Sequence, residues 1–193
     1  MTCKASNRYE EVKANECSIN YEDIENALRV IGVNEPNTIL DKCIGFIKKN
    51  NEVLSKRYLL DNQECVLIST YTHDGSGSAA PYGKINSMLM EGSVEFQKES
   101  EKSYLRLFLR TLRKLSMTKP QTLYRALKSY HEYKEGEEID WKNFSSASKV
   151  MSPVQIFLNC GARGNGGTLF EIRGACGYCI SDFSLYPYEQ GIK

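Results

Sequence analysis

Three short segments in the last part of the chain carry side chains that could do chemistry together. Arg125 ends a short apolar run, a Ser-x-Ser formed by Ser146 and Ser148 follows an aromatic residue, and Glu189 follows a Tyr-Pro pair. A guanidinium binds phosphate oxygens through forked, charge-assisted hydrogen bonds, and a carboxylate stabilises a developing positive charge. Each segment alone is weak evidence for such a site, because an arginine at a strand end more often forms a surface ion pair and a lone glutamate is usually solvated.

The order of these segments, and the residues that frame them, strengthen the case that the three segments form one site. The chain reads, in order, 123–126, a Tyr-x-x-Gly turn within 133–139, 144–148, 168–172, 177–181 and 183–189. This order resembles that of the arginine-type mono-ADP-ribosyltransferases, with their Arg, Ser-Thr-Ser and Glu-x-Glu elements. Two earlier segments, 71–72 and 82–86, look like the Tyr-Thr and Tyr-x-x-x-Asn segments that precede the long helix of that family. The resemblance covers roughly residues 66 to 191 and is specific in combination.

The resemblance implies a site for NAD, which the family cleaves as a substrate. Arg125 would bind the pyrophosphate of NAD. The backbone of Ala126, where glycine is usual, would hold the nicotinamide amide. Ser146 would hydrogen-bond within the site and orient the carboxylate element, while Ser148 would line the cofactor site or support its strand.

An aromatic contact to the nicotinamide is a further expectation of the resemblance. Phe157 or Tyr178 could supply it, with core packing as the alternative role for each. No metal is expected, because the chain has two histidines, His73 and His131, and neither lies near a pair of cysteines. The Cys-x-x-Cys at Cys176 and Cys179 is therefore read as ordinary thiols in a reducing compartment.

The last motif departs from the family pattern. Glu189 matches its first glutamate, which helps to position or deprotonate the acceptor, but the second, catalytic glutamate falls on Gly191. Three explanations stay open: an inactivating replacement made to trap a complex, a naturally inactive relative, or a register in which Glu189 itself is the catalytic carboxylate. Loss of one preorganised electrostatic group costs about 10²–10³ in rate.

The resemblance predicts a transferase that moves ADP-ribose from NAD to a protein side chain, with arginine as the expected acceptor and NAD hydrolysis as a side reaction. The alternative is a catalytically silent domain of the same fold that binds NAD or a protein partner. Family members act as secreted or surface enzymes in animals and as toxins or effectors in microbes. The first 20 residues are polar, so neither a signal peptide nor an anchor is expected in them, and the compartment stays open.

Composition sets broad limits on the fold and the partners. At 193 residues with 41% hydrophobic side chains, the chain is expected to form one compact domain, mainly helical over 1–119 and mainly β over 120–193. The 25 basic and 24 acidic side chains nearly cancel, so neither nucleic acid nor a membrane surface is an expected partner. No run is long and apolar enough to predict a membrane span.

The elements that must position the motif residues follow from periodicity. Helices are predicted after Asn20 up to Gly32, from a cap at 37–38 to 48–49, over 96–116, and from Ser152 with Pro153 at its first position. Strands are predicted over 121–126, 137–148, 168–173 and 177–184, and a loop over 159–167. The predicted class is α+β, a helical N-terminal half packed on a β-rich C-terminal half of two packed sheets with an NAD cleft.

Overall fold

The structure, a computed structural model, describes residues 18–74, 80–90, 102–141, 143–159, 167–186 and 191–192. These residues belong to two compact units. The helical unit contains the described residues up to Ser116 together with Asp182–Tyr186, and the β-rich unit contains Met117–Ser181 and the strand Gly191–Ile192. The predicted division into a helical N-terminal part and a β-rich C-terminal part is confirmed. The prediction of one domain over 1–193 stays a prediction.

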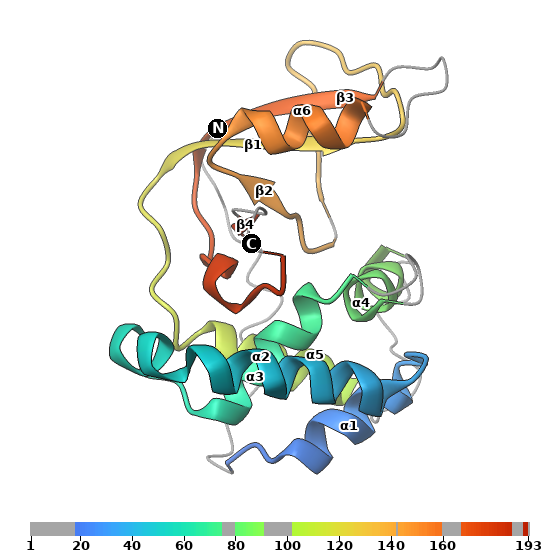
Figure 1. The fold of residues 1–193 in the computed structure, drawn as a ribbon. Coiled ribbons are helices and arrows are strands. Elements are labelled where there is room, and N and C mark those ends of the chain that lie inside the picture. The colour runs from blue at the N-terminus through green and yellow to red at the C-terminus, as the bar shows by residue number, and fades with distance from the viewer. Residues whose placement is uncertain are drawn as a thin grey trace. The chain divides into compact units, whose positions relative to one another are not determined.

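The helical unit consists of five helices among its described residues (Figure 1). They are α1 (Tyr21–Val30), α2 (Pro36–Arg57), α3 (Asn62–Thr72), α4 (Pro81–Met90) and α5 (Lys102–Leu112). The predicted cap of the first helix is present, because Asn20 and Asp23 form a reciprocal capping box. Gly32, with a φ of 74°, follows the end of α1 in the left-handed region, where glycine is strongly favoured.

Two helix boundaries differ from the prediction. α2 begins at Pro36, before the predicted cap, and continues past 48–49 to Arg57, because Leu54 extends its buried stripe. α5 is shorter than the predicted helix over 96–116. Its last turn tightens, since the amides of Lys114 and Leu115 bond to carbonyls three residues back, and the helix ends at Leu112. Residues 96–101 lie outside the described residues.

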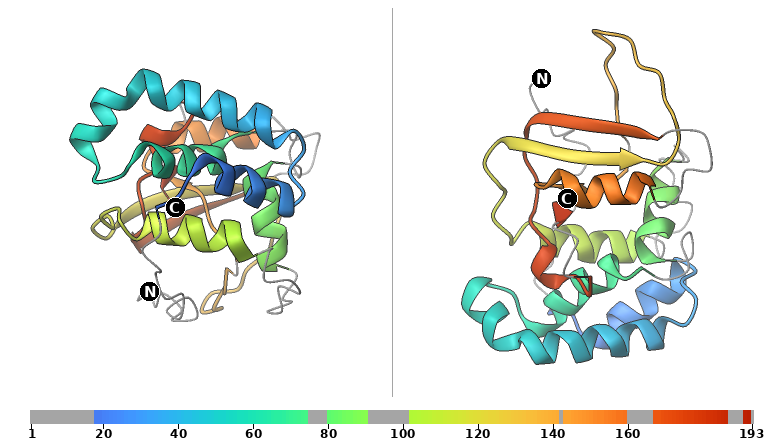
Figure 2. Two further views of the ribbon diagram at one scale, coloured as in Figure 1. Left: turned by 90° about the horizontal axis from the view of Figure 1, so that it is seen from below. Right: turned by 45° about the horizontal axis from the view of Figure 1, so that its top comes forward.

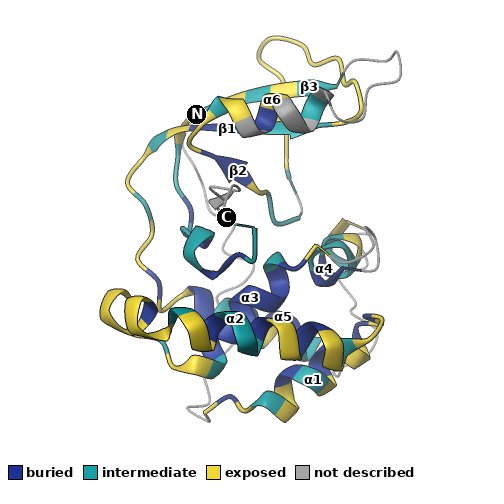
Figure 3. Ribbon diagram, in the orientation of Figure 1, coloured by how far each residue is buried: buried dark blue, intermediate teal, exposed yellow. Residues whose placement is uncertain are grey.

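The core of the helical unit is built around α3, which is buried along most of its length (Figure 3). The rings of Tyr71 and Phe108 stack at 4.3 Å, and Phe108 lies on α5. The Tyr104 hydroxyl lies 2.8 Å from Thr70 Oγ1. Burial raises the pKa of the Tyr104 phenol above its usual range, so this hydroxyl stays protonated.

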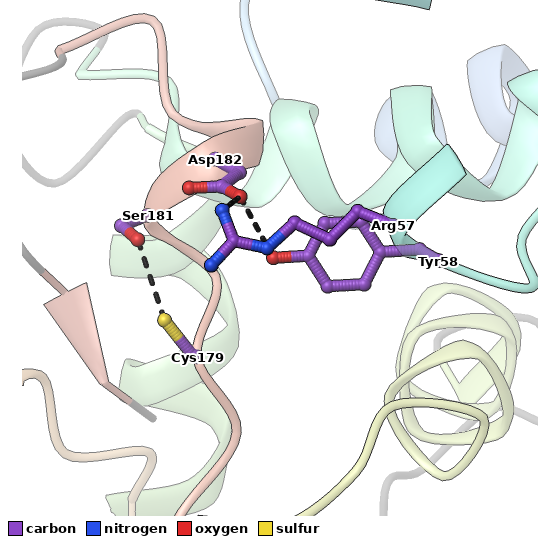
Figure 4. A network of polar contacts seen from close by, with 5 residues as sticks. All are labelled: Arg57, Tyr58, Cys179, Ser181 and Asp182. Atoms are coloured by element: carbon purple, nitrogen blue, oxygen red, sulfur yellow. Dashed lines mark hydrogen bonds and ion pairs between the residues drawn. The ribbon is translucent and has the colours of Figure 1, made fainter. Parts of the chain in front are cut away.

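The segment Asp182–Tyr186 belongs to the helical unit although it lies late in the chain. Figure 4 shows Arg57 and Tyr58 both reaching Asp182, with the Tyr58 hydroxyl 2.9 Å from the carboxylate. Phe183 is fully buried and packs against Tyr58 at 4.8 Å. The predicted strand over 177–184 is therefore wrong: Ser181–Phe183 forms a short 3₁₀ helix, which turns Phe183 into the core.

The β-rich unit contains a four-stranded antiparallel sheet in the order β3-β1-β2-β4. Figure 2 shows its two long strands, β1 in yellow and β3 in orange-red, side by side. Its strands are β1 (Gln121–Leu127), β2 (Ala147–Ser148), β3 (Thr168–Ala175) and β4 (Gly191–Ile192). Helix α6 (Met151–Asn159) contacts β1 and β2. Beyond the sheet, Met117 and Tyr178 form an isolated bridge. The predicted strands over 121–126 and 168–173 correspond to β1 and β3.

Two further predictions for this unit are wrong. Among the described residues of the predicted strand over 137–148, only Ala147–Ser148 is a strand, because Gly136 at a φ of 84° opens a turn and a charged loop follows it. Helix α6 begins at Met151, before Ser152, which places Pro153 within the first turn and not at its first position. A proline is tolerated there, since the first-turn amides have no partner within the helix. Of the predicted loop over 159–167, residues 160–166 lie outside the described residues.

Candidate active site

The sheet places the strands of the three motifs side by side. Tyr124, next to Arg125, pairs with Ser148 of β2, and Ser148 pairs in turn with Gly191 of β4. These pairings join segments that are far apart in the sequence into adjacent strands of one sheet. The motif order along the chain is therefore also the strand order β1-β2-β4.

Arg125 is held by contacts in two directions. Its Nη1 donates a hydrogen bond of 2.9 Å to the backbone carbonyl of Ser146. Its guanidinium carbon lies 5.5 Å from the centroid of the Trp141 ring, within the range of a cation–π interaction. A guanidinium carries five N–H donors in one plane, a set that suits two phosphate oxygens at once. The arrangement fixes a cation beside the Ser-x-Ser segment.

The two serines of the Ser-x-Ser have different surroundings. Ser146 is exposed, and its carbonyl accepts the hydrogen bond from Arg125. Ser148 is buried within β2, and its Oγ accepts a hydrogen bond of 3.1 Å from the amide of Val150. The Ser148 hydroxyl is thus bonded to the backbone two residues further on, whereas Ser146 is exposed at the surface.

The remaining predicted residues are placed only in part. Ala126 lies in β1, where it pairs with Leu169 of β3. Gly191 lies in β4. Phe157 lies in α6, but its side chain is outside what the structure describes, and Glu189 lies outside the described residues.

Sequence reasoning missed the aromatic residues around Arg125. Phe170 of β3 pairs directly with Arg125 in the ladder, and Trp141 meets the Phe170 ring edge-on at 5.2 Å. Tyr133 packs on the same ring at 5.5 Å. The one signal in the sequence was that Trp141 is the single tryptophan of the chain. Nothing in its spacing indicated a contact with Arg125.

The described helices and antiparallel sheet form the fold of the ADP-ribosyltransferases. The crystal structure of the eukaryotic mono-ADP-ribosyltransferase ART2.2 matches 92% of this chain and 77% of its own with a TM-score of 0.62 and 19% identity. A variant of the same enzyme in complex with NAD, in which a glutamate is replaced by isoleucine, matches 89% of this chain and 73% of its own with a TM-score of 0.63 and 19% identity.

A bacterial enzyme shares the fold as well. The ADP-ribosyltransferase HopU1 of Pseudomonas syringae pv. Tomato DC3000 matches 91% of this chain and 87% of its own, with a TM-score of 0.53 and 16% identity. No protein-family model and no curated protein sequence matches this chain. The likeness therefore shows the fold, at a level of identity that leaves the activity to be argued from the residues. Among the described residues, no helix has the length and apolar character needed to cross a membrane.

Proposed function

We propose that this chain is a member of the mono-ADP-ribosyltransferase family that binds NAD and transfers ADP-ribose to a protein side chain. The observation that carries the proposal is the strand order β1-β2-β4, with Arg125 in β1, Ser148 in β2 and Gly191 in β4. Solved neighbours with this fold are mono-ADP-ribosyltransferases, and one was solved with NAD bound. A shared fold alone would not support the function, but the motif residues occur in it in the family's order.

The proposed binding roles follow from the chemistry of each group. Arg125, held by Ser146 and Trp141, binds the pyrophosphate of NAD. The backbone of Ala126 binds the nicotinamide amide, and Phe157 or Tyr178 supplies the aromatic contact to the nicotinamide ring. Ser146, exposed beside Arg125, orients the carboxylate element, and Ser148 supports the strand through Val150.

The proposed reaction needs a carboxylate beside the ribose, because breaking the bond to nicotinamide leaves an oxocarbenium-like sugar. Gly191 is the position where the family has that carboxylate, and it pairs with Ser148 in the sheet. Glycine has no side chain for this role. This favours a second candidate, a domain that binds NAD or a protein partner without turnover. NAD binding itself is expected either way, since the complex of the ART2.2 variant with NAD formed after a glutamate had been replaced.

Arginine is the proposed acceptor, because Glu189 matches the first glutamate of the family motif. An extract incubated with the full chain and isotopically labelled NAD, followed by peptide mass spectrometry, tests both candidates. We expect labelled ADP-ribose on arginine peptides with the Gly191→Glu form. Modification by the unchanged chain would support transfer without that carboxylate and identify Glu189 for testing. No adduct with either form, combined with NAD-dependent thermal stabilisation, would support the silent domain. No stabilisation by NAD would contradict the transferase and the NAD-binding form of the silent domain, and would leave a domain that binds a protein partner.

A further inference from the structure

We infer that Trp141 is a positioning residue, whose indole ring holds the Arg125 guanidinium in the orientation that binds the pyrophosphate of NAD. The inference rests on the proposed function and goes beyond it, since Trp141 is not part of any of the three motifs. Trp141 lies in the loop between β1 and β2, the two strands that carry Arg125 and the Ser-x-Ser.

The geometry at Arg125 is that of a side chain fixed at two points. The Ser146 carbonyl accepts a hydrogen bond from Nη1 at 2.9 Å, and the Trp141 ring centroid lies 5.5 Å from the guanidinium carbon. The hydrogen bond sets the position of one nitrogen, and the ring restricts rotation of the group about that nitrogen. An arginine side chain loses rotamer entropy when it is ordered, so a guanidinium that is fixed before NAD arrives binds NAD more tightly.

Trp141 is itself held in place by β3. Its ring meets Phe170 edge-on at 5.2 Å with an interplanar angle of 87°, the favoured arrangement for an aromatic pair. Phe170 is the ladder partner of Arg125, and directly paired residues of antiparallel strands share a face. The same sheet face therefore carries both the arginine and the ring that supports the tryptophan.

The loop that carries Trp141 is tied to β3 at a second point. The Thr168 hydroxyl donates to the Ser129 carbonyl at 3.0 Å and accepts from the His131 amide at 2.8 Å. Tyr133 adds a ring contact to Phe170. These contacts hold the loop between β1 and β2, which has no regular secondary structure, against β3. Trp141 therefore reaches Arg125 from a loop that is fixed at several points.

The test is calorimetric titration of the full chain with NAD. We expect Trp141→Leu to weaken NAD binding roughly 3- to 30-fold, the range that corresponds to a cation–π contact. Trp141→Phe should restore part of the affinity, because it keeps an aromatic face. Tyr130→Leu is the matched control, since Tyr130 is exposed in the same loop and should leave affinity unchanged. In an Arg125→Ala background, Trp141→Leu should have little further effect. A purely structural role of Trp141 would weaken binding equally in both backgrounds.

A ligand-free measurement checks the contact itself. Because Trp141 is the single tryptophan, its fluorescence emission reports on its surroundings alone. Arg125→Ala should shift that emission, whereas Arg173→Ala, at an exposed arginine of β3 bonded to Glu171, should not. No shift with Arg125→Ala, or full NAD affinity in a folded Trp141→Leu variant, would overturn the inference and leave the proposed function standing. No NAD binding by the unchanged chain would overturn both.

Discussion

Arg125 donates a hydrogen bond of 2.9 Å to the backbone carbonyl of Ser146, and this bond joins the first and second motifs across 21 positions of sequence. A carbonyl accepts this bond whichever side chain residue 146 carries. Replacement of the serine therefore leaves the support of Arg125 in place, while replacement of the arginine removes the cation.

Arg125→Ala should weaken NAD binding about 10- to 100-fold, because charge-assisted hydrogen bonds contribute about 1.5–3 kcal/mol each. Titration calorimetry measures the effect. Arg173→Ala serves as the control, since Arg173 lies on β3 of the same sheet and is bonded to Glu171 at 2.7 Å. Equal NAD affinity in the Arg125→Ala variant and the unchanged chain would show that the pyrophosphate is bound elsewhere.

The thiols of the described residues should differ sharply in reactivity. Burial raises the pKa of Cys43 to about 11 and, with help from the carboxylates of Asp61 and Glu64, that of Cys65 to about 12. The thiolate is the reactive form, so both should resist iodoacetamide at pH 8 in the native protein. Cys176 and Cys179 are partly exposed and should be alkylated first. Peptide mass spectrometry before and after denaturation gives the order. Early labelling of Cys43 would mean that α2 is not packed as described.

Glu64 at the start of α3 serves both a cap and an ion pair. Its carboxylate accepts from the Asp61 amide at 3.2 Å and from Lys114, while its side chain is 3% exposed. Glu64→Ala loses both interactions and should cost about 2 kcal/mol of unfolding free energy in urea. Glu64→Gln keeps the cap and loses the charge, so it should cost less. Equal losses in the two variants would assign the whole effect to the ion pair.

Two glycines should respond in opposite ways to alanine. A Cβ at Gly167, just before β3, would collide with the Leu127 carbonyl and the Leu158 side chain, so Gly167→Ala should destabilise the protein by about 1–3 kcal/mol. Gly45 lies within α2 with open space around it, and Gly45→Ala should stabilise by about 0.5–1 kcal/mol. Urea denaturation measures both. A neutral Gly167→Ala would mean that the segment before β3 does not approach β1 as closely as described.

Local chemistry in the sequence predicted much of the fold. The capping residues of α1 act within a few positions, so Asn20 and Gly32 could be recognised directly. The strand predicted over 137–148 failed because Ile139 and Trp141 alternate with polar residues as in a strand. The Gly136 turn and the ring of Phe170 instead make the segment a loop. The strand predicted over 177–184 also failed, because the conformation around Phe183 depends on residues far away in the sequence. Arg57 and Tyr58 bind Asp182, the neighbour of Phe183.

The sequence predicted the order of the motifs in the candidate site, but it did not predict the contacts that hold Arg125. The strand neighbours of β2 agree with the motif order in the chain, whereas the cation–π contact of Arg125 with Trp141 depends on a loop whose path no local pattern encodes. Glu189 lies outside the described residues, so its role stays a prediction.

The most direct test of the account is nicotinamide release from NAD by the Gly191→Glu and Gly191→Gln variants. Gly191 pairs with Ser148 beside the strand of Arg125, where a carboxylate would act on the charge that develops on the ribose. We predict that Gly191→Glu raises the rate of release by at least ~10²-fold over the unchanged chain. Gly191→Gln, which adds bulk and order without charge, should give little gain. Equal rates in the two variants, or full activity of the unchanged chain that is abolished by Glu189→Gln, would contradict the assignment of Gly191 to the carboxylate position.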